Sequence, residues 1–584
     1  MGKWDLSILY SGLDDPSFAS DMKALEGYIA EYAELAKVAA ALPHGELLRK
    51  YVKLTVDLNS TVSKVAIFCN LRYSANTQDM ESASALGRIM ALTSSLASPS
   101  ASLNKVIAGF SDLEELVGEP DLSEFSYFLL NIKRDSKYLL GDGEEAVFAK
   151  LNISGASAWS DLHSALTSTV KANYRGEEIT LPAVRNLAYD KDPEVRRDAY
   201  YAELACYPAI EESVAFALNS IKLQVLSECE LRGYESPLAK SLYDSRMKRK
   251  TLDALVEAIE EYLPQFRKYL RAKARALGHE GGLPWYDLFA PMGRLEKTFD
   301  VEGAKSYLLD IFGKFDSELH DLVKCAFENA WIDFYPRENK VGGAFDCGIP
   351  SACESRVLTN FDGSFSSVTT LAHELGHSFH DRQVSRNSII NQDYSMPVAE
   401  TASTFNEVLV METAMAGARD AEEKLALLEN ELMESCQIIC DIYSRFKFEA
   451  SVFEHRTEEF MNAKRLSELM LDAQKLAYGD GLDEGLMHPY MWLCKGHYYS
   501  GGLSFYNYPY AFGGLFARGL YAKYKSEGEP FVEVYKRMLN ATGVMDVEDC
   551  ALVAGVDLTD VNFWRAGLAG IAEKIDEFVK IVNN

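Results

Sequence analysis

The sequence predicts a mainly α-helical protein, because helical apolar patterns recur along the chain and strand signals are sparse. Residues 251–278 (TLDALVEAIEEYLPQFRKYLRAKARALG) are the clearest case. One stripe of this segment carries the apolar residues Leu252, Leu255, Ile259, Leu263, Phe266 and Leu270. Thr251 stands where an N-cap is favoured and Gly278 where a helix ends. Pro264 is expected to break or kink this helix near its middle.

Strand signals are confined to a few short segments. Residues 177–182 (EEITLP) follow the turn-like YRG and predict half of a small hairpin. Residues 342–346 (GGAFD) and 356–361 (RVLTNF) predict a second short sheet. A chain of 584 residues is expected to form more than one domain, and we place a boundary near residue 200, which separates an N-terminal helical region (1–200) from a C-terminal domain (201–584).

The composition is that of a packed globular protein, with 48% hydrophobic and 25% charged residues. A net charge of −28 argues against nucleic acid or an anionic membrane as a partner. The first residues, MGKWDLSILYSG, lack the pattern of a secretory signal, and no apolar run is long enough to cross a bilayer. Ten cysteines without paired spacing are typical of a reducing compartment, so we expect a cytoplasmic protein.

The segment TLAHELGHSFH (370–380) contains three of the ten histidines. Serines and threonines precede an apolar-periodic run here, which predicts a helix. On a helix, His373 and His377 project from the same side, where each can place a nitrogen roughly 2.0–2.1 Å from one Zn²⁺. Glu374 then lies beside the metal, where it can accept a proton from a metal-activated water. The motif predicts a metal-dependent hydrolase.

A third protein ligand must come from elsewhere. His380 is seven residues from His373, or ~10 Å along a helix, which is too far to share one ion. Glu400 is the best candidate, because an apolar sequence (MPVAETA) surrounds it and a metal would compensate its burial. Pro397 can open a second helix on which Glu407 shares a face with Glu400. Three residues on this helix could hydrogen-bond the ligand side chains without contacting the metal: Ser403, Thr404 and Glu407.

A tyrosine-rich stretch near the C-terminus contains further hydrogen-bond donors. Tyr506, Tyr508 and Tyr510 alternate, and His497 lies nine residues before the first of them. Phenol hydroxyls and a histidine are suitable donors to an oxygen that gains negative charge in a transition state. An aromatic stripe that only lines a core is the alternative interpretation. The glycines on both sides of the stretch would allow it to close over a substrate.

Three stretches together resemble the oligoendopeptidase F branch of the thimet-oligopeptidase (M3) family of zinc metallopeptidases. They are GGAFDCGIPSACESRVLTNFDGSFSSVTTLAHELGHSFH, PVAETASTFNE and GHYYSGGLSFYNYPYAFGGLFA. The likeness extends upstream through YRGEEITLPAVRNLAYDKDPEVRRDAYYA, which resembles the N-terminal module of that branch, at about 115–190 here. It covers most of the chain from about residue 120 onward.

The resemblance implies a nearly all-helical, two-lobed zincin-type fold, with a deep substrate channel, the zinc on its floor and a short β-sheet near the metal site. It makes His373, His377 and Glu400 the ligands of one Zn²⁺ and Glu374 the catalytic base. A histidine and a tyrosine of the matching segment stabilise the tetrahedral intermediate in that family. His497 is the histidine, Tyr508 our first choice for the tyrosine and Tyr506 the second, although the segment CKGHYYSGG departs from the commoner spacing.

Three functional hypotheses follow. The favoured one is a zinc oligoendopeptidase that hydrolyses internal bonds of short unfolded peptides. The second is a helical zinc carboxypeptidase or dipeptidyl carboxypeptidase with the same ligands, in which a basic group fixes the C-terminal carboxylate of the substrate. The third is a helical scaffold or peptide-binding protein with an inert motif. Cleavage preference and oligomeric state are not predicted.

Overall fold

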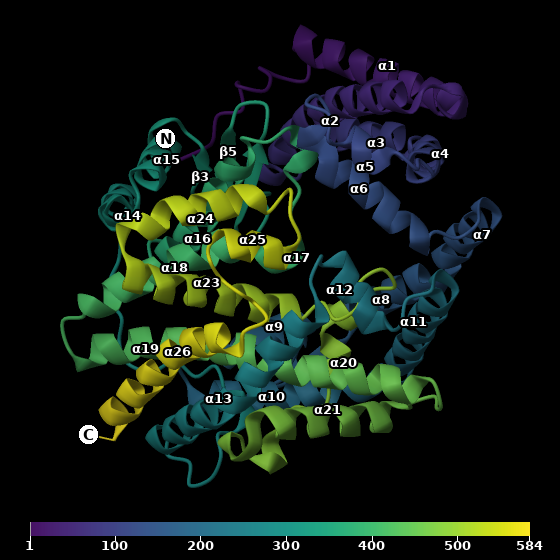
Figure 1. Ribbon diagram of the computed structural model, residues 1–584. Helices are drawn as coiled ribbons and strands as arrows, with labels where there is room; N and C mark the ends of the chain where they lie inside the picture. Colours follow the sequence, from purple (N-terminus) through teal and green to yellow (C-terminus); the bar gives the residue numbers. More distant parts are fainter. Residues whose placement is uncertain (1, 584) are drawn as a thin grey trace. The chain divides into compact units, whose positions relative to one another are not determined.

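The computed structural model describes residues 2–583, which are mainly helical and contain a few short strands (Figure 1). Backbone contacts divide the chain into two compact units, each assembled from three segments. Unit 1 comprises Met1–Lys137, Lys297–Val410 and Lys523–Val556, and unit 2 comprises Tyr138–Glu296, Met411–Ala522 and Asp557–Asn584. Because each unit is built from separate segments, this division does not test a single boundary near residue 200, and that boundary stays a prediction.

Unit 1 contains the N-terminal helices and the helix of the histidine motif. Its helices are α1 (Pro16–Val38), α2 (His44–Ala75), α3 (Met80–Ser94), α4 (Ala97–Ala108), α5 (Leu113–Leu116), α6 (Ser126–Asp135), α14 (Val301–Phe315), α15 (Ser317–Glu328), α16 (Phe365–Val384), α17 (Met396–Ala399), α24 (Glu529–Ala541) and α25 (Val547–Val553). The first four pack through a continuous apolar core that includes Leu25, Leu47 and Phe68. Burial of these side chains, each worth about 1.5–3 kcal/mol, stabilises the helical N-terminal region that the apolar spacing predicts.

A small three-stranded sheet lies in unit 1 and has the order β3-β5-β4. Strand β3 (Ile332–Asp333) is parallel to β5 (Glu354–Leu358), and β4 (Phe345–Ile349) is antiparallel to β5. The two segments predicted to pair therefore do so, although β4 begins three residues later than the expected segment. Helix α16 packs against both β4 and β5, so the sheet supports the helix of the histidine motif.

Unit 2 is a helical body with one hairpin. Its helices are α7 (Asp142–Asn152), α8 (Ala158–Thr169), α9 (Leu181–Asn186), α10 (Pro193–Cys206), α11 (Glu211–Arg232), α12 (Pro237–Asp244), α13 (Arg249–Ala276), α19 (Ala421–Cys436), α20 (Ile442–Arg456), α21 (Ala463–Tyr478), α22 (Met491–Cys494) and α26 (Val561–Val582). Helices α18 (Thr401–Ala416) and α23 (Tyr508–Glu527) contain residues of both units. Nowhere in residues 2–583 is a helix both long and apolar enough to cross a bilayer.

The predicted hairpin of unit 2 is confirmed. Strand β1 (Lys171–Tyr174) pairs antiparallel with β2 (Glu177–Thr180). The two turn residues between them, Arg175 and Gly176, both have positive φ. Two such residues form the kind of turn whose twist matches that of the paired strands.

Helix α13 is the segment that the apolar stripe predicts, and all six stripe residues are buried. Gly278, with φ +90°, follows the helix as expected. The helix continues through Pro264, so a break there is wrong, whereas a kink stays a prediction. The proline removes one helical hydrogen bond, at a cost of about 3 kcal/mol. The buried stripe continues on both sides of it and packs against α26, beside which α13 runs in Figure 1. Burial of six large apolar side chains outweighs one lost hydrogen bond.

Candidate metal centre

Helix α16 places the histidine motif on a rigid element of unit 1. The helix is capped by Ser364, whose side chain accepts a hydrogen bond from the Ser367 backbone N–H. His373 and His377 lie one turn apart on the same side of the helix, with their ring centroids 4.8 Å apart. Glu374 is buried, with 7% of its surface exposed.

Glu400 lies at a break between two helices. Pro397 stands in the first turn of α17, but this helix ends where Glu400 leaves the helical conformation (φ −89°, ψ 11°). Helix α18 begins at the next residue. The expected single helix that carries both Glu400 and Glu407 is therefore wrong. This break allows the Glu400 side chain to leave the helix surface and reach α16.

Gly376, inside the histidine motif, permits the close approach of α16 and α18. A Cβ atom at Gly376 would lie 2.5 Å from the Ser403 Cα and 2.6 Å from the Ala402 carbonyl oxygen. No side chain fits between backbones at that distance. The glycine between the two histidines is therefore what brings the start of α18, and with it Glu400, to the imidazoles.

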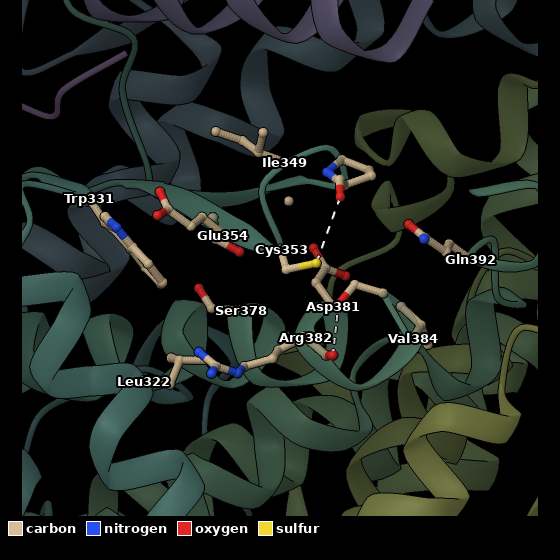
Figure 2. Close-up of a pocket in the computed structure, with 14 residues that line it drawn as sticks. Leu322, Trp331, Ile349, Cys353, Glu354, Ser378, Asp381, Arg382, Val384 and Gln392 are labelled. Atoms are coloured by element: carbon tan, nitrogen blue, oxygen red, sulfur yellow. Dashed lines mark hydrogen bonds between the residues drawn. The ribbon is translucent and has the colours of Figure 1, made fainter. Parts of the chain in front are cut away.

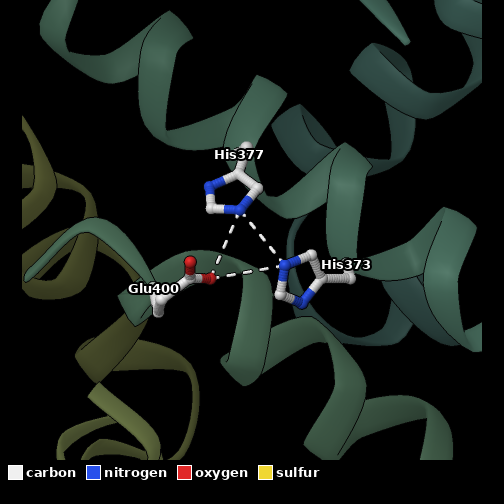
Figure 3. A group of neighbouring side chains, drawn as sticks. All are labelled: His373, His377 and Glu400. Carbon is white, nitrogen blue, oxygen red and sulfur yellow. Dashed lines mark hydrogen bonds and ion pairs between the residues drawn. The ribbon is translucent and has the colours of Figure 1, made fainter. Parts of the chain in front are cut away.

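The two imidazoles and the Glu400 carboxylate converge on one point (Figure 3). Oε2 of Glu400 lies 3.3 Å from Nε2 of His373 and 3.3 Å from Nε2 of His377. The two Nε2 atoms are 3.2 Å apart. The three predicted ligands are thus brought together, each offering one atom to a nearly equilateral triangle.

These distances fit a tetrahedral metal ion. A triangle with edges of this length is one face of a tetrahedron whose centre lies ~2.0 Å from each corner, which is the usual length of Zn–N and Zn–O bonds. The fourth corner would be left for water or substrate, as in catalytic zinc sites. The donor set of two imidazoles and one carboxylate suits such an ion as well.

Neighbouring groups orient two of the three ligands, His373 and Glu400. Glu407 accepts a hydrogen bond from His373 Nδ1 at 2.8 Å, which leaves the Nε2 lone pair of that ring directed at the centre. Ser403 donates to Glu400 Oε2 at 2.8 Å. Burial disfavours the charged His373 ring, but hydrogen bonds with Glu400 and Glu407 outweigh it and raise the pKa of His373 to about 10. Burial likewise opposes the Glu400 carboxylate, and the two histidines still hold the pKa of Glu400 well below its ordinary value.

Glu374 is held by the backbone of the sheet. Its carboxylate accepts a hydrogen bond from the Asp346 N–H on strand β4. Burial raises the pKa of Glu374, although His373 and His377 act in the opposite direction. A carboxylate with a raised pKa, fixed in orientation beside a metal site, has the properties of a general acid and base.

The sequence interpretation missed a second buried group, one turn further along α16. Asp346 and Asp381 are hydrogen-bonded to each other, and Tyr394 donates to Asp381 at 3.0 Å. Burial and the adjacent Asp381 charge raise the pKa of Asp346 well above its ordinary value. The available signal was the position of Asp381, one turn after His377 on the same helix.

Asp381 and Ser378 also line a pocket of about 160 Å³ between α16 and the β4–β5 hairpin (Figure 2). Cys353, on the hairpin turn, and Gln392 contribute to its wall. Gly348 lines the same pocket, and its N–H donates to Asp381. A Cβ at Gly348 would lie 2.4 Å from Asp381 Oδ2. The strand therefore contacts the helix at two successive outward amides, those of Asp346 and Gly348.

His380 has a structural environment. It is fully buried, its ring stacks on Tyr394, and its Nε2 lies 2.8 Å from Thr542 Oγ1. Burial lowers the pKa of His380 to about 3, so the ring is neutral. These contacts agree with the expectation that His380 does not coordinate the metal.

The candidate oxyanion donors all lie in unit 2. The His497 ring is 5.0 Å from that of Tyr506 and 6.1 Å from that of Tyr510. Tyr508 is buried (2% exposed), and its hydroxyl donates to Ser245 Oγ at 2.8 Å. Burial raises the pKa of Tyr508 to about 12. The structure therefore groups His497 with Tyr506 and Tyr510, and directs the Tyr508 hydroxyl to α12 and the residue after it.

A buried ion pair supports the tyrosine segment. Lys222 Nζ and Glu449 Oε1 are 2.6 Å apart, and each side chain is 1% exposed. Asn507, between Tyr506 and Tyr508, donates to the second Glu449 oxygen at 3.2 Å. The conformation of the segment thus depends on a charge pair that the sequence pattern did not reveal.

This chain is similar to known proteins over most of its length. A model of peptidase family M3 matches residues 186–569, and a model described as oligopeptidase F matches residues 109–171. Oligopeptidase PepF of Bacillus subtilis is 26% identical over 80% of this chain and 70% of its own. Group B oligopeptidase PepB of Streptococcus agalactiae is 24% identical over 93% of this chain and 91% of its own.

Solved structures share the fold. A crystal structure from Chlamydophila abortus superposes with a TM-score of 0.86 at 21% identity, covering 99% of this chain and 98% of the other. Oligoendopeptidase-F from Enterococcus faecium gives a TM-score of 0.70 at 18% identity, covering 96% and 99%. Since the family model spans most of the chain and includes the His–His–Glu triangle, the chain belongs to peptidase family M3 and is a metalloendopeptidase of the oligoendopeptidase F type.

Proposed function

We propose that the protein is a zinc-dependent oligoendopeptidase that hydrolyses internal bonds of short, unfolded peptides. The observation that carries the proposal is the triangle of two Nε2 atoms and one carboxylate oxygen with edges of 3.2–3.3 Å. His373, His377 and Glu400 would hold the ion. Bound zinc would supply Lewis acidity toward a water molecule and a peptide carbonyl.

Glu374 is the proposed general base. Its carboxylate takes a proton from the attacking water and then delivers that proton to the leaving amine nitrogen. Burial raises its pKa, which makes the carboxylate a stronger base for the first transfer. The Asp346 N–H holds the carboxylate in one orientation throughout.

His497 and a tyrosine are the proposed donors to the oxyanion. Tyr508 was the first choice from the sequence, but its hydroxyl is already engaged by Ser245 in a buried position. Tyr506 is only partly buried, lies against His497, and its hydroxyl has no hydrogen bond within residues 2–583. We therefore propose Tyr506 before Tyr508 as the partner of His497.

Strand β4 is the proposed docking edge for an extended peptide, because β5 lies between β4 and β3. The amides of Asp346 and Gly348 already donate to Glu374 and Asp381. A peptide would therefore pair with β4 mainly by donating its own N–H groups to the carbonyls there. Such pairing depends on backbone rather than side chains, which favours broad sequence tolerance.

The proposal includes a cytoplasmic location, which is supported by ten free cysteines. A peptide blocked at both ends and internally quenched tests endopeptidase action, since a carboxypeptidase needs a free C-terminus. We expect wild type to cleave it and to contain one zinc per chain. Glu374→Gln is expected to retain zinc and lose turnover. Absence of zinc from active wild type, or full activity of Glu374→Gln, would refute the proposal.

A further inference from the structure

Unit 2 contains a cavity of about 200 Å³ whose lining residues all belong to that unit. Three basic side chains line it, together with a single carboxylate, that of Glu203. Aromatic rings form much of the remaining wall: Tyr189, Tyr200, Trp285, Tyr286 and Phe289. A positively charged cavity is unusual in a chain of net charge −28, and the metal centre makes no use of it.

The single carboxylate is already neutralised. Glu203 is contacted by Arg185 Nη1 at 2.5 Å, by the Tyr207 hydroxyl at 2.6 Å and by His488 Nε2 at 3.1 Å. Burial opposes its ionisation, but His488 and Arg185 outweigh burial and lower the pKa of Glu203 to about 2. Glu203 therefore has no remaining capacity to balance another cation.

Of the three basic groups, Arg196 and Arg185 are each paired with a carboxylate, whereas the Lys495 ammonium is not. Arg196 pairs with the buried Asp287 at 2.8 Å and donates to two backbone carbonyls. Arg185 uses Nη1 alone, and its other nitrogens make no hydrogen bond within residues 2–583. The Lys495 ammonium makes neither a hydrogen bond nor an ion pair with any described residue. Asp441, the acidic group whose charge acts on Lys495, is paired with Arg445.

A further donor lines the same cavity. Nε2 of Gln437 is inaccessible to solvent and has no hydrogen-bond partner among the described residues. Gln437 opens a π-helical turn, Gln437–Asp441, and such turns are frequent at functional sites. Burial, assisted by the charge of Arg445, lowers the pKa of Lys495, which shows that the ammonium lacks compensation. An anion in the cavity would balance the Lys495 ammonium and accept hydrogen bonds from the Arg185 nitrogens that have no protein partner.

We propose that this cavity is a carboxylate-binding site, in which Lys495 and Arg185 hold the carboxylate and the aromatic wall covers an apolar stem. Charge-assisted hydrogen bonds from a lysine and an arginine suit a carboxylate. Two sources share this chemistry, the C-terminal carboxylate of a peptide and a free small organic acid. Assignment to a peptide rests on the proposed peptidase function, whereas the anion site itself does not.

The site has a direct connection to the tyrosine segment. Lys495 precedes His497 by two residues. Burial and the charges of Arg445 and Lys495 lower the pKa of His497. A bound carboxylate would offset the Lys495 charge and so act on the same histidine that we propose as an oxyanion donor.

The test is calorimetric titration of the zinc-loaded, full-length protein with N-acetylphenylalanine and with its amide, which differ only in the carboxylate. We expect the acid to bind and the amide not to bind measurably. Lys495→Gln should weaken binding of the acid about tenfold or more, while Lys495→Arg should stay within a few-fold of wild type. Lys464→Gln, an exposed lysine of the same unit, is the matched control and should bind as wild type.

Several outcomes would overturn the proposal. One is equal binding of the acid and the amide, and another is wild-type binding of the acid by Lys495→Gln. A third is binding that survives in Lys495→Gln but disappears in His377→Ala, because this result would locate the carboxylate at the metal centre. If Lys495→Gln does not fold, Gln437→Glu replaces it, because a second negative charge in the cavity should abolish binding. Acetate binding as tightly as N-acetylphenylalanine would assign the site to free acids, and much weaker acetate binding to peptide ends. Glu374→Gln should bind the acid as wild type does, so loss of turnover and loss of this site are distinguishable.

Discussion

Removing the Glu407 carboxylate should weaken zinc binding without removing a ligand. Glu407 accepts the hydrogen bond from His373 Nδ1 at 2.8 Å, and about a third of its side chain is exposed. A hydrogen bond to a charged group is worth about 1.5–3 kcal/mol, and partial exposure favours the lower half of that range. Mutation of such partners typically reduces metal affinity 10–100-fold, or about 1.4–2.8 kcal/mol.

The two variants of Glu407 should differ in a defined way. Glu407→Gln keeps an oxygen that can accept from Nδ1 but loses the charge, so we expect about a tenfold loss of affinity. Glu407→Ala loses both and should approach a hundredfold loss. The fourth corner of the metal site and Glu374 are untouched, so turnover at saturating zinc should fall less than affinity does.

Competition between the protein and a chromophoric zinc chelator, at fixed pH and ionic strength, measures these affinities. Glu458→Gln, an exposed position in unit 2, is the matched control and should leave zinc affinity unchanged. Wild-type affinity in Glu407→Ala would refute the reasoning, because it would mean that His373 needs no support to present Nε2. An affinity below that of Glu400→Ala would also refute it, since Glu407 would then be the ligand.

Three further outcomes are expected. Glu374→Gln should bind one zinc per chain but lower kcat for the doubly blocked peptide about 10²–10⁴-fold, and a smaller effect would contradict its role as base. Lys222→Met should cost about 3–5 kcal/mol in denaturant unfolding by leaving Glu449 buried and unpaired, and the double variant with Glu449→Leu should recover most of that loss. His380 has a folded pKa of about 3 against an ordinary value of 6.5, so the unfolded chain binds an extra proton between these values. As pH falls from 6.5 toward 3, metal-free wild type should lose about 1.4 kcal/mol per pH unit more than His380→Gln, and parallel stability curves would contradict this.

The proposed metal ligands could be predicted because their signal is local. His373 and His377 are fixed by helix spacing, and Glu400 stood out as a carboxylate in an apolar run. Gly376 gave a weaker signal, since a glycine inside a helix is unfavourable by itself. The reason for a glycine here is seen only in the structure, where the Ser403 backbone leaves no room for a Cβ atom at Gly376.

The tyrosine that we propose as an oxyanion donor could not be predicted in the same way. Alternation of Tyr506, Tyr508 and Tyr510 suggests equivalent residues, yet Tyr508 begins helix α23 and its hydroxyl is buried. Its partner Ser245 lies 263 residues earlier in the chain. A pattern of a few residues cannot reveal a contact between residues so far apart in the chain. Sequence position alone therefore cannot show which tyrosine hydroxyl already has a hydrogen-bond partner.

Backbone N–H groups that contact the site also could not be predicted from the sequence, and strand β4 contains two of them. The Asp346 amide holds Glu374 and the Gly348 amide holds Asp381, so successive outward amides of one strand hold two carboxylates of α16. Every residue except proline has an N–H, so a sequence cannot mark these two as special. Gly348 is needed because a Cβ there would displace Asp381. The orientation of the proposed base therefore depends on how closely a strand approaches a helix, which is a property of packing and not of the histidine motif.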